Sequence, residues 1–505
     1  MSDQRELFHP TTWQRIIGVV WDGARKDPVE RRLLLRLDVG ILIYQILSFI
    51  IQCIDTNNVT NAYVSGMKED LQLYGNELNY FSTAIYVGYV IGCIPAQFIL
   101  YKMRPSTFIP ICNIIWGVLV MCLGAVSHAW HIYIIRFLIG LCEAVCYPAF
   151  TMIVSSWYKP DELAKRMVIY DASTAIGAMC AGYIQAGVYH SMNGRYGLAG
   201  WKWQFIVDGL ISLPVGMLGF YCIPDFPKNT RVRWLNDKQR ELCIQRMDEV
   251  GRKGQKKMTR KRFWKIFTTF NVYPFLITYS IYITNGFNYM NLWLESLGTY
   301  SIEMINILPT IGYAIAFVGT FIYAMVSDTT GWRWQSLMVA IAFNFLGNLL
   351  LALWDIPFGL KFFAYLCPNF GQPIWGLLVT WSSELFPDDA ELRGLLPAIG
   401  NTIWYGLNSF VPILAFPMQD APHFPVGYWI SSAFLLTMAI GVVTMLIGNY
   451  VELRKKAVFV NKYGVTIATE DADDSASVSS SAFQQPGMQY ELTHLKKTQS
   501  RNNTD

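Results

Sequence analysis

Charged residues are scarce in this chain, which argues against a water-soluble globular protein. Asp, Glu, Lys and Arg make up 15% of its 505 residues, whereas about 25% is usual in a soluble domain. Hydrophobic residues make up 53%, and the mean hydropathy is +0.29. We therefore expect most of the surface to face a non-aqueous solvent, as in an integral membrane protein.

Cysteines and histidines form no functional pattern. Nine of the ten cysteines lie in apolar stretches, Cys243 lies in a basic loop, and no CxxC pair occurs. The cysteines therefore indicate neither a disulfide framework nor a metal site, and we expect them to be small packing residues. All six histidines lie in loops, tails or the ends of apolar runs, so proton transfer by histidine is not expected.

Sequence signatures of enzymes and nucleic-acid-binding proteins are missing as well. The chain has no HExxH, no GxSxG in a strand–helix setting and no Walker motif, so an integral membrane enzyme is not expected. It has no zinc or RNA-binding signature, and its basic residues lie beside apolar runs. We therefore expect no cofactor, no metal and no nucleic-acid partner.

Long apolar runs are abundant. A membrane-spanning helix needs about 20 mostly apolar residues. Twelve such runs occur, of which the seventh and tenth carry the most polar residues: 37–62, 79–101, 106–126, 132–155, 167–189, 203–223, 267–293, 304–325, 334–354, 360–384, 394–417 and 425–449.

The order of these runs predicts an all-α integral membrane protein of two six-helix halves, 37–223 and 267–449. The halves flank a hydrophilic segment, 224–266, and are typical of inverted repeats with a substrate site near the bilayer midplane. The first 36 residues are polar, so we expect no cleavable signal peptide. The tail, 450–505, carries acidic and serine clusters and is expected to be disordered.

The distribution of Lys and Arg predicts the orientation. With the N-terminus in the cytoplasm, 35 of the 40 basic residues fall in cytoplasmic segments. Lys68, Arg195, Lys202 and Lys361 fall on the opposite side, and Arg136 falls inside a span. The positive-inside rule therefore predicts that both termini are cytoplasmic.

Three charged residues lie deep in the predicted spans: Asp55, Arg136 and Glu143. Each costs roughly 2.5–3.5 kcal/mol at the bilayer centre on insertion scales. Arg136 and Glu143 are two helical turns apart, about 10 Å. Arg136 is a candidate partner for an anion or for Asp55, and the two acids are candidate proton carriers. A structural ion-pair network is the alternative. Asp171, near the start of its span, is a candidate gate residue.

Uncharged polar and aromatic residues also lie in the spans. The candidate cavity-lining residues are Asn57, Asn288, Asn401, Tyr44 and Tyr282. Such amides hydrogen-bond a ligand or hold helices together, and both interpretations remain open. Gly88 and Gly92 have the GxxxG spacing that permits close helix approach.

Several stretches together resemble one family. They are Asp55 to Leu71, Arg136 to Gly140, Glu143-Ala144, Ser156 to Tyr158, Gly197 to Ile206, and Pro224 to Pro227. On these the sequence resembles the anion:cation symporters of the major facilitator superfamily, in their fungal allantoate-permease-like branch. The resemblance implies that superfamily's twelve-helix fold and proton-coupled symport of an organic anion. It implies coupling roles for Asp55 and Glu143, an anion site at Arg136 and a polar contact from Asn401.

One departure from the family pattern bears on the substrate. Many members carry an arginine directly after the first-helix acid, where this chain has Thr56. A single buried arginine favours a singly charged anion. The segments 61–71 and 74–78 are most similar to biotin and pantothenate transporters, whose substrates are monocarboxylates. Allantoate, nicotinate, a small peptide and a sulfonate stay open, as does a non-transporting nutrient sensor. We expect a monomer in the plasma membrane.

Overall fold

The computed structural model describes residues 27–249, 271–281, 289–385 and 390–463, and in these residues it contains helices and no strand. The first group of helices comprises α2 (Pro28–Leu37), η2 (Asp38–Leu42), α3 (Ile43–Ala62), η3 (Tyr63–Met67), α4 (Lys68–Asp70), α5 (Glu77–Lys102), α6 (Pro105–Leu123), α7 (Ala129–Glu143), α8 (Cys146–Trp157), α9 (Pro160–Met192), η4 (Arg195–Gly197), α10 (Gly200–Cys222) and α11 (Asp237–Glu249).

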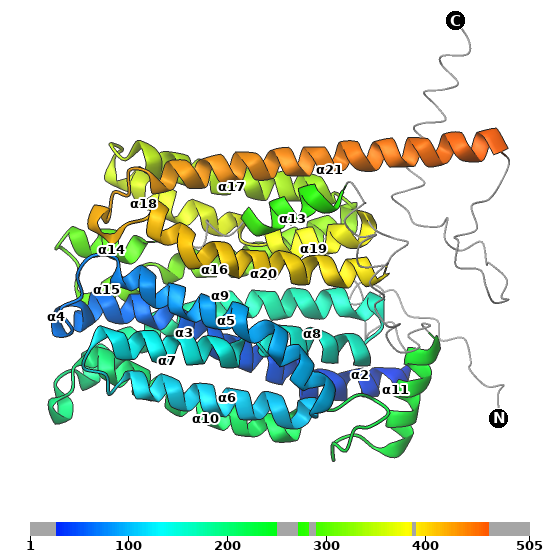
Figure 1. The fold of residues 1–505 in the computed structure, drawn as a ribbon, viewed down its shortest axis with the longest axis horizontal. Coiled ribbons are helices and arrows are strands. Elements are labelled where there is room, and N and C mark those ends of the chain that lie inside the picture. The colour runs from blue at the N-terminus through cyan, green and yellow to red at the C-terminus, as the bar shows by residue number, and fades with distance from the viewer. Residues whose placement is uncertain (1–26, 250–270, 282–288, 386–389, 464–505) are drawn as a thin grey trace, which may run out of the picture.

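The second group comprises α13 (Val272–Ile281), α14 (Met290–Ser296), α15 (Ile302–Ile307), α16 (Thr310–Thr330), α17 (Arg333–Leu353), α18 (Phe358–Leu366), η6 (Cys367–Gly371), α19 (Ile374–Leu385), α20 (Ala390–Ala415), η7 (Met418–Asp420) and α21 (Gly427–Tyr463). The long helices run side by side (Figure 1). Helices α6, α7 and α10 lie at one side of the bundle and α17, α18 and α21 at the other, with α3, α9, α16 and α20 between them.

Eight helical stretches within the described residues are long and apolar enough to cross a membrane. Each coincides with a predicted span, and they are Pro28–Asp70, Pro105–Leu123, Ala129–Trp157, Arg166–Met192, Gly200–Cys222, Ile302–Ser327, Arg333–Leu353 and Gly427–Val451. The predicted spans 79–101 and 394–417 fall on α5 and α20. The chain is thus an all-helical, multi-pass membrane protein, while the count of twelve spans stays a prediction.

The first and last long helices of the described chain extend beyond the predicted apolar runs. The first predicted span, 37–62, lies inside a helical stretch that begins at Pro28. Helix α21 continues to Tyr463, past the predicted span end at 449. Residues 450–463 contain good helix formers and no proline. Loss of hydropathy therefore marks where the lipid-facing surface ends, whereas the helix continues.

Glycine lets α5 and α7 approach closely. A Cβ on Gly88 would clash with the carbonyl oxygen of Phe137, and one on Gly140 would clash with that of Ile85. Gly92 packs against Leu141 in the same way, with 3.1 Å from its would-be Cβ to the Leu141 Cα. Any larger residue would push the helices apart. This contact fixes the segment of α7 that carries Arg136.

Proline explains the interruption between α7 and α8. Pro148 has no N–H to offer the carbonyl of Ala144, four residues earlier, and its ring crowds that carbonyl. The helix is accordingly broken at Ala144 and Val145. Glu143 is therefore the last residue of α7, at a point where the backbone hydrogen-bond ladder is locally open.

A buried ion cluster fastens α11 to the first group of helices. The Arg246 guanidinium donates to both oxygens of Glu162, at 2.5 and 2.6 Å, and its Nε lies 2.8 Å from Glu30. Nearby, Arg166 binds Asp38 through two bonds of 2.7 and 2.9 Å. Each buried charge is therefore paired, as the low dielectric of the site requires. The central hydrophilic segment, as far as Glu249, packs as part of the first group.

Candidate functional site

Arg136 is a residue of α7 whose side chain is buried against α3, with 3% of its surface exposed. Its Nη2 donates to the backbone carbonyl oxygen of Asp55 at 3.1 Å. It forms no ion pair within 4.0 Å with a carboxylate of the described residues, and its Nε has no hydrogen-bond partner among them. A guanidinium offers five N–H donors in a planar fork. Arg136 therefore keeps donors free for an anion.

Glu143 lies two turns further along the same helix and is as deeply buried as Arg136. Gln52 of α3 donates from its Nε2 to the Glu143 Oε2 at 3.2 Å, while Oε1 has no partner within the described part of the chain. A buried carboxylate with one unsatisfied oxygen is costly, whereas a protonated carboxyl has a smaller desolvation cost. The geometry suits a group that gains and loses a proton.

Asp55 lies at the centre of the buried charges. Its carboxyl interacts electrostatically with Asp208 of α10, with Glu143 and with Arg136, and the Trp116 indole lies beside it. Neither carboxyl oxygen accepts a hydrogen bond of normal geometry from the described residues. The structure thus brings together Asp55, Arg136 and Glu143, the three charged residues that lie deep in the predicted spans.

Next to these charges, aromatic side chains fill the space between the two groups of helices. We define this aromatic cluster as Tyr86, Tyr89, Tyr279, Trp375, Trp404 and Tyr405. Tyr89 and Tyr405 stack with ring centroids 3.7 Å apart, and Tyr86 lies 6.2 Å from Trp404. The chain of rings continues from Trp404 to Trp375 at 5.1 Å and on to Tyr279 at 5.4 Å.

The aromatic cluster and the charged residues form one continuous region. Tyr86 interacts electrostatically with both Arg136 and Glu143, and Tyr405 interacts with Glu143. One edge of this region is therefore charged and belongs to the first group of helices. The other edge is aromatic and belongs to α13, α19 and α20. Such a combination of apolar walls and few fixed polar groups is typical of a small-molecule site.

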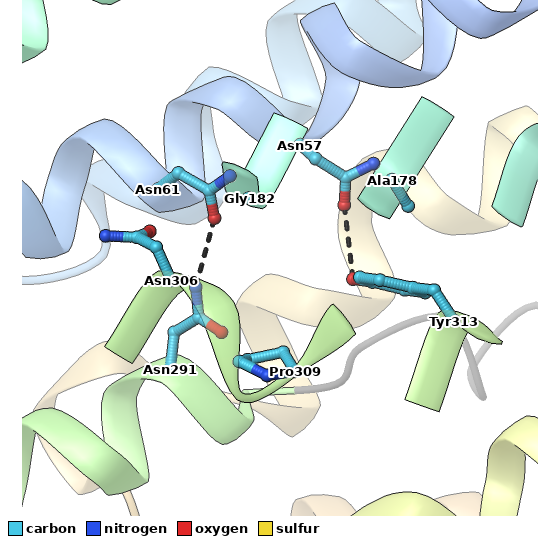
Figure 2. A pocket seen from close by; sticks show the side chains of 8 residues that line it. All are labelled: Asn57, Asn61, Ala178, Gly182, Asn291, Asn306, Pro309 and Tyr313. Carbon is cyan, nitrogen blue, oxygen red and sulfur yellow. Dashed lines mark hydrogen bonds between the residues drawn. The ribbon is translucent and has the colours of Figure 1, made fainter. Parts of the chain in front are cut away.

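A second polar region lies where α3 and α9 meet α14, α15 and α16. Figure 2 shows this amide pocket, which is lined by Asn57, Asn61, Ala178, Gly182, Asn291, Asn306, Pro309 and Tyr313. Asn291 donates from its Nδ2 to the Asn61 Oδ1 at 3.0 Å, and the Tyr313 hydroxyl donates to the Asn57 Oδ1 at 3.4 Å. These bonds join the two groups of helices across the pocket.

Asp171 lies where the two groups of helices meet, whereas Asn401 lies beside a contact within the second group. Asn401 is a buried residue of α20 and follows Gly400, which packs against the Tyr279 ring. Asp171 lies on α9 opposite Gly376 of α19, with 3.6 Å between the would-be Cβ of that glycine and the Asp171 Oδ2. The position of Asp171 suits a side chain that closes a path between the two groups.

The remaining predicted cavity residues lie elsewhere. Tyr44 is buried in the core between α3 and α6, where its hydroxyl accepts a 2.7 Å hydrogen bond from Asn113 and its ring packs against Phe150. Tyr282 and Asn288 lie outside the described residues. Tyr44 thus packs within the first group, apart from the aromatic cluster.

Gln52 and Asp208 were not among the predicted site residues, although Asp208 is a charged residue of the predicted span 203–223 and a recurring pattern of polar residues points to both. Polar residues recur every three or four positions along α3 and are all buried: Gln45, Ser48, Gln52, Asp55 and Asn58. That spacing places them on one face of the helix. On α10, Gln204, Asp208 and Ser212 recur every four positions and are buried too. The partner of Asp208, Asn58, lies 150 residues away along the chain.

These features define a class. A multi-pass bundle whose two groups of helices enclose buried charges and an aromatic wall is the architecture of a membrane transporter. Residues 46–412 match the family model described as Major Facilitator Superfamily, and the chain belongs to this superfamily of transporters.

Three fungal relatives support that assignment over most of the chain. A pantothenate transporter of Schizosaccharomyces pombe is 31% identical, with 86% of this chain and 84% of the relative covered. An MFS transporter of Pestalotiopsis fici, PfmaC, is 33% identical, with coverage of 83% and 80%. A vitamin H transporter of Saccharomyces cerevisiae is 29% identical, with coverage of 80% and 70%.

Solved structures support the fold. The crystal structure of a D-xylose–proton symporter aligns with a TM-score of 0.61 at 16% sequence identity, over 81% of this chain and 97% of the symporter. At this identity the likeness concerns the fold alone.

Proposed function

We propose that this protein is a secondary active transporter that carries a small organic monocarboxylate together with a proton, with pantothenate and biotin as the first candidates. The single observation that carries the proposal is the buried Arg136 guanidinium, which has free donors beside two carboxyls. The names of the fungal relatives supply the two candidate vitamins.

The charge of the site favours one carboxylate. Among the described residues, Arg136 is the buried basic side chain that interacts with both Asp55 and Glu143. Thr56, which stands where many family members have an arginine, turns its hydroxyl onto its own helix and donates to the Gln52 carbonyl at 2.9 Å. The site therefore offers one strong fixed partner for a negative charge, which is sufficient for a monocarboxylate.

The rest of the region suits the body of such a substrate. Pantothenate contains an amide and hydroxyl groups, and biotin contains a cyclic urea on a hydrocarbon chain. The aromatic cluster offers apolar surface with hydroxyl and indole groups at its edges, and the amide pocket offers carboxamides that both donate and accept. Other organic anions, namely allantoate, nicotinate, a small peptide or a sulfonate, would meet the same arginine and are the competing substrates.

Proton coupling would reside in Asp55 and Glu143. Both are buried and each has at least one oxygen without a partner in the described residues, so neither is stabilised as a permanent anion. The proposal includes twelve spans in two halves, both termini in the cytoplasm, and action as a monomer in the plasma membrane. Asp171, opposite α19, is proposed as a gate residue.

Uptake by cells that express the full chain tests this function. Labelled pantothenate and biotin are offered with and without a protonophore, and unlabelled nicotinate, allantoate, a dipeptide and a sulfonate are tested as competitors. The expected result is protonophore-sensitive accumulation of at least one vitamin. Arg195→Gln, which removes an exposed basic residue, is the control for Arg136→Gln. Absence of uptake for every candidate at normal surface expression would favour the alternative function, a non-transporting nutrient sensor.

A further inference from the structure

We propose that Asp208 on α10 is a third carboxyl of the coupling site and shares a proton with Asp55. The inference rests on the proton coupling proposed above. It adds a helix outside the α3–α7 pair to the residues that handle the proton.

The partners of Asp208 leave half of its carboxyl unsatisfied. Asp208 is 2% exposed. Its Oδ2 accepts a hydrogen bond from the Asn58 carboxamide, and the Asn58 Oδ1 accepts one from Gln204 at 2.7 Å. The Asp208 Oδ1 has no partner among the described residues. An ionised carboxylate buried with one bare oxygen is strongly disfavoured, whereas a proton on that oxygen removes the charge.

Asn58 links Asp208 to Asp55. Asn58 follows Asp55 by three residues on α3, so the two side chains lie on the same face about one turn apart. Asp55 and Asp208 interact electrostatically, and neither oxygen of Asp55 accepts a hydrogen bond of normal geometry in the described part of the chain. Two neighbouring carboxyls in a low dielectric do not both ionise readily, and they commonly share one proton.

The charge balance points to the same conclusion. Helices α3, α6 and α9 pack against α10. Among the described residues, Asp55 of α3 is the charged side chain that interacts with Asp208, while Trp116 of α6 lies beside Asp55. Through Asp55 the pair connects with Arg136 and Glu143 of α7. Three carboxyls thus accompany one guanidinium, so the site is neutral only when it holds two protons.

In this arrangement the proton moves between the two carboxyls. Transfer breaks the O–H bond on one aspartate and forms an O–H bond on the other, and the pair keeps a charge of minus one. A second proton, when it arrives, neutralises the pair. Asn58, which contacts Asp208 and shares a helix face with Asp55, is a positioning residue for this exchange.

Asp208→Asn in the full-length protein tests the assignment, with Asp225→Asn as the matched control. Asp225 is also a buried aspartate of the first group, but it accepts a 3.2 Å hydrogen bond from the backbone N–H of Ser106, away from the site. Surface expression, substrate-induced proton uptake, the accumulation ratio at several pH values and counterflow exchange are measured. One coupled proton gives roughly a tenfold change in accumulation ratio per pH unit.

We expect Asp208→Asn to lose that pH dependence and the proton uptake while it retains exchange, and Asp225→Asn to behave like the parent. Unchanged pH dependence and proton uptake in Asp208→Asn would overturn the assignment. If Asp208→Asn fails to reach the surface, Asn58→Ala decides: an altered pH profile with unchanged substrate affinity supports the shared proton, and a parent-like profile refutes it. A parent protein without substrate-induced proton uptake would refute proton coupling itself, which is a distinguishable result.

Discussion

A hydrogen bond to the backbone leaves the Arg136 guanidinium available to bind an anion. Because its Nη2 donates to the Asp55 carbonyl and not to the Asp55 carboxylate, the guanidinium is held in place without being neutralised. Lysine would keep the positive charge but lose the planar fork that fits a carboxylate. Replacement of Arg136 by lysine and by glutamine therefore separates the effect of its charge from the effect of its geometry.

Arg136→Lys is predicted to weaken substrate binding, and Arg136→Gln to abolish transport. Loss of a charge-assisted hydrogen bond costs about 1.5–3 kcal/mol, which corresponds to roughly a ten- to hundredfold rise in apparent KM for the lysine variant. Concentration-dependent uptake measured beside surface expression checks both. Near-parent affinity for a carboxylate in surface-expressed Arg136→Gln would make the arginine a structural residue.

Glu143→Gln is predicted to uncouple transport from the proton gradient. The amide preserves the shape of the protonated acid but cannot release a proton, so exchange should survive while uphill accumulation and its pH dependence disappear. Accumulation ratios at acidic and neutral pH, with and without a protonophore, provide the measurement, and Asp55→Asn is the parallel variant. Parent-like, pH-dependent accumulation by Glu143→Gln would remove this residue from the mechanism.

At the scale of the helices, side-chain hydrogen bonds join the first group to the second. Beyond the amide pocket, Asn79 of α5 donates to the Phe416 carbonyl at 2.7 Å, and Thr83 donates to the Ser409 carbonyl of α20 at 2.7 Å. Ser65 of η3 accepts from Asn306 of α15 at 3.2 Å. Neutral hydrogen bonds contribute about 1 kcal/mol each. Because each bond is weak, together they hold the two groups of helices in contact and still allow them to separate.

Asn61→Ala is predicted to favour opening of the amide pocket. It removes the bond to Asn291, and a loss of about 1 kcal/mol shifts a conformational equilibrium roughly fivefold. The rate at which a membrane-impermeant maleimide labels a cysteine placed at Ala178, in a background without native cysteines, reports the opening. Asn344→Ala, which breaks a bond within α17 alone, is the matched control. Equal labelling rates in both variants would contradict a role of this bond in closure.

For the whole molecule, the periodicity and hydropathy of the sequence were sufficient to predict an all-helical membrane bundle and the buried charges at Asp55, Arg136 and Glu143. They were not sufficient to predict Asp208, because its significance comes from Asn58, a contact between distant parts of the chain. For Tyr44, the sequence does not distinguish an aromatic side chain that faces a cavity from one that, as here, packs within the core. The aromatic cluster draws on α5, α13, α19 and α20, so only the folded chain reveals it.

The orientation of the molecule gives a further prediction. Because 35 of 40 basic residues fall in segments assigned to the cytoplasm, tags at residues 1 and 505 should be accessible only after the membrane is permeabilised. The sequon at Asn58 should remain without a glycan, since that side chain is fully buried. Antibody binding to the terminal tags on intact cells would contradict the twelve-span arrangement.

The docking of α11 determines where the chain can be cut. The pairing of Arg246 with Glu162 and Glu30 assigns residues up to Glu249 to the first group of helices, although hydropathy alone ends the first half at residue 223. Two fragments expressed from separate genes should reassemble when the break follows residue 249. A break between residues 223 and 237 would leave α11 on the other fragment, with Glu162 and Arg246 dependent on a contact between chains. Genetic complementation by split genes would thus locate the boundary between the two units.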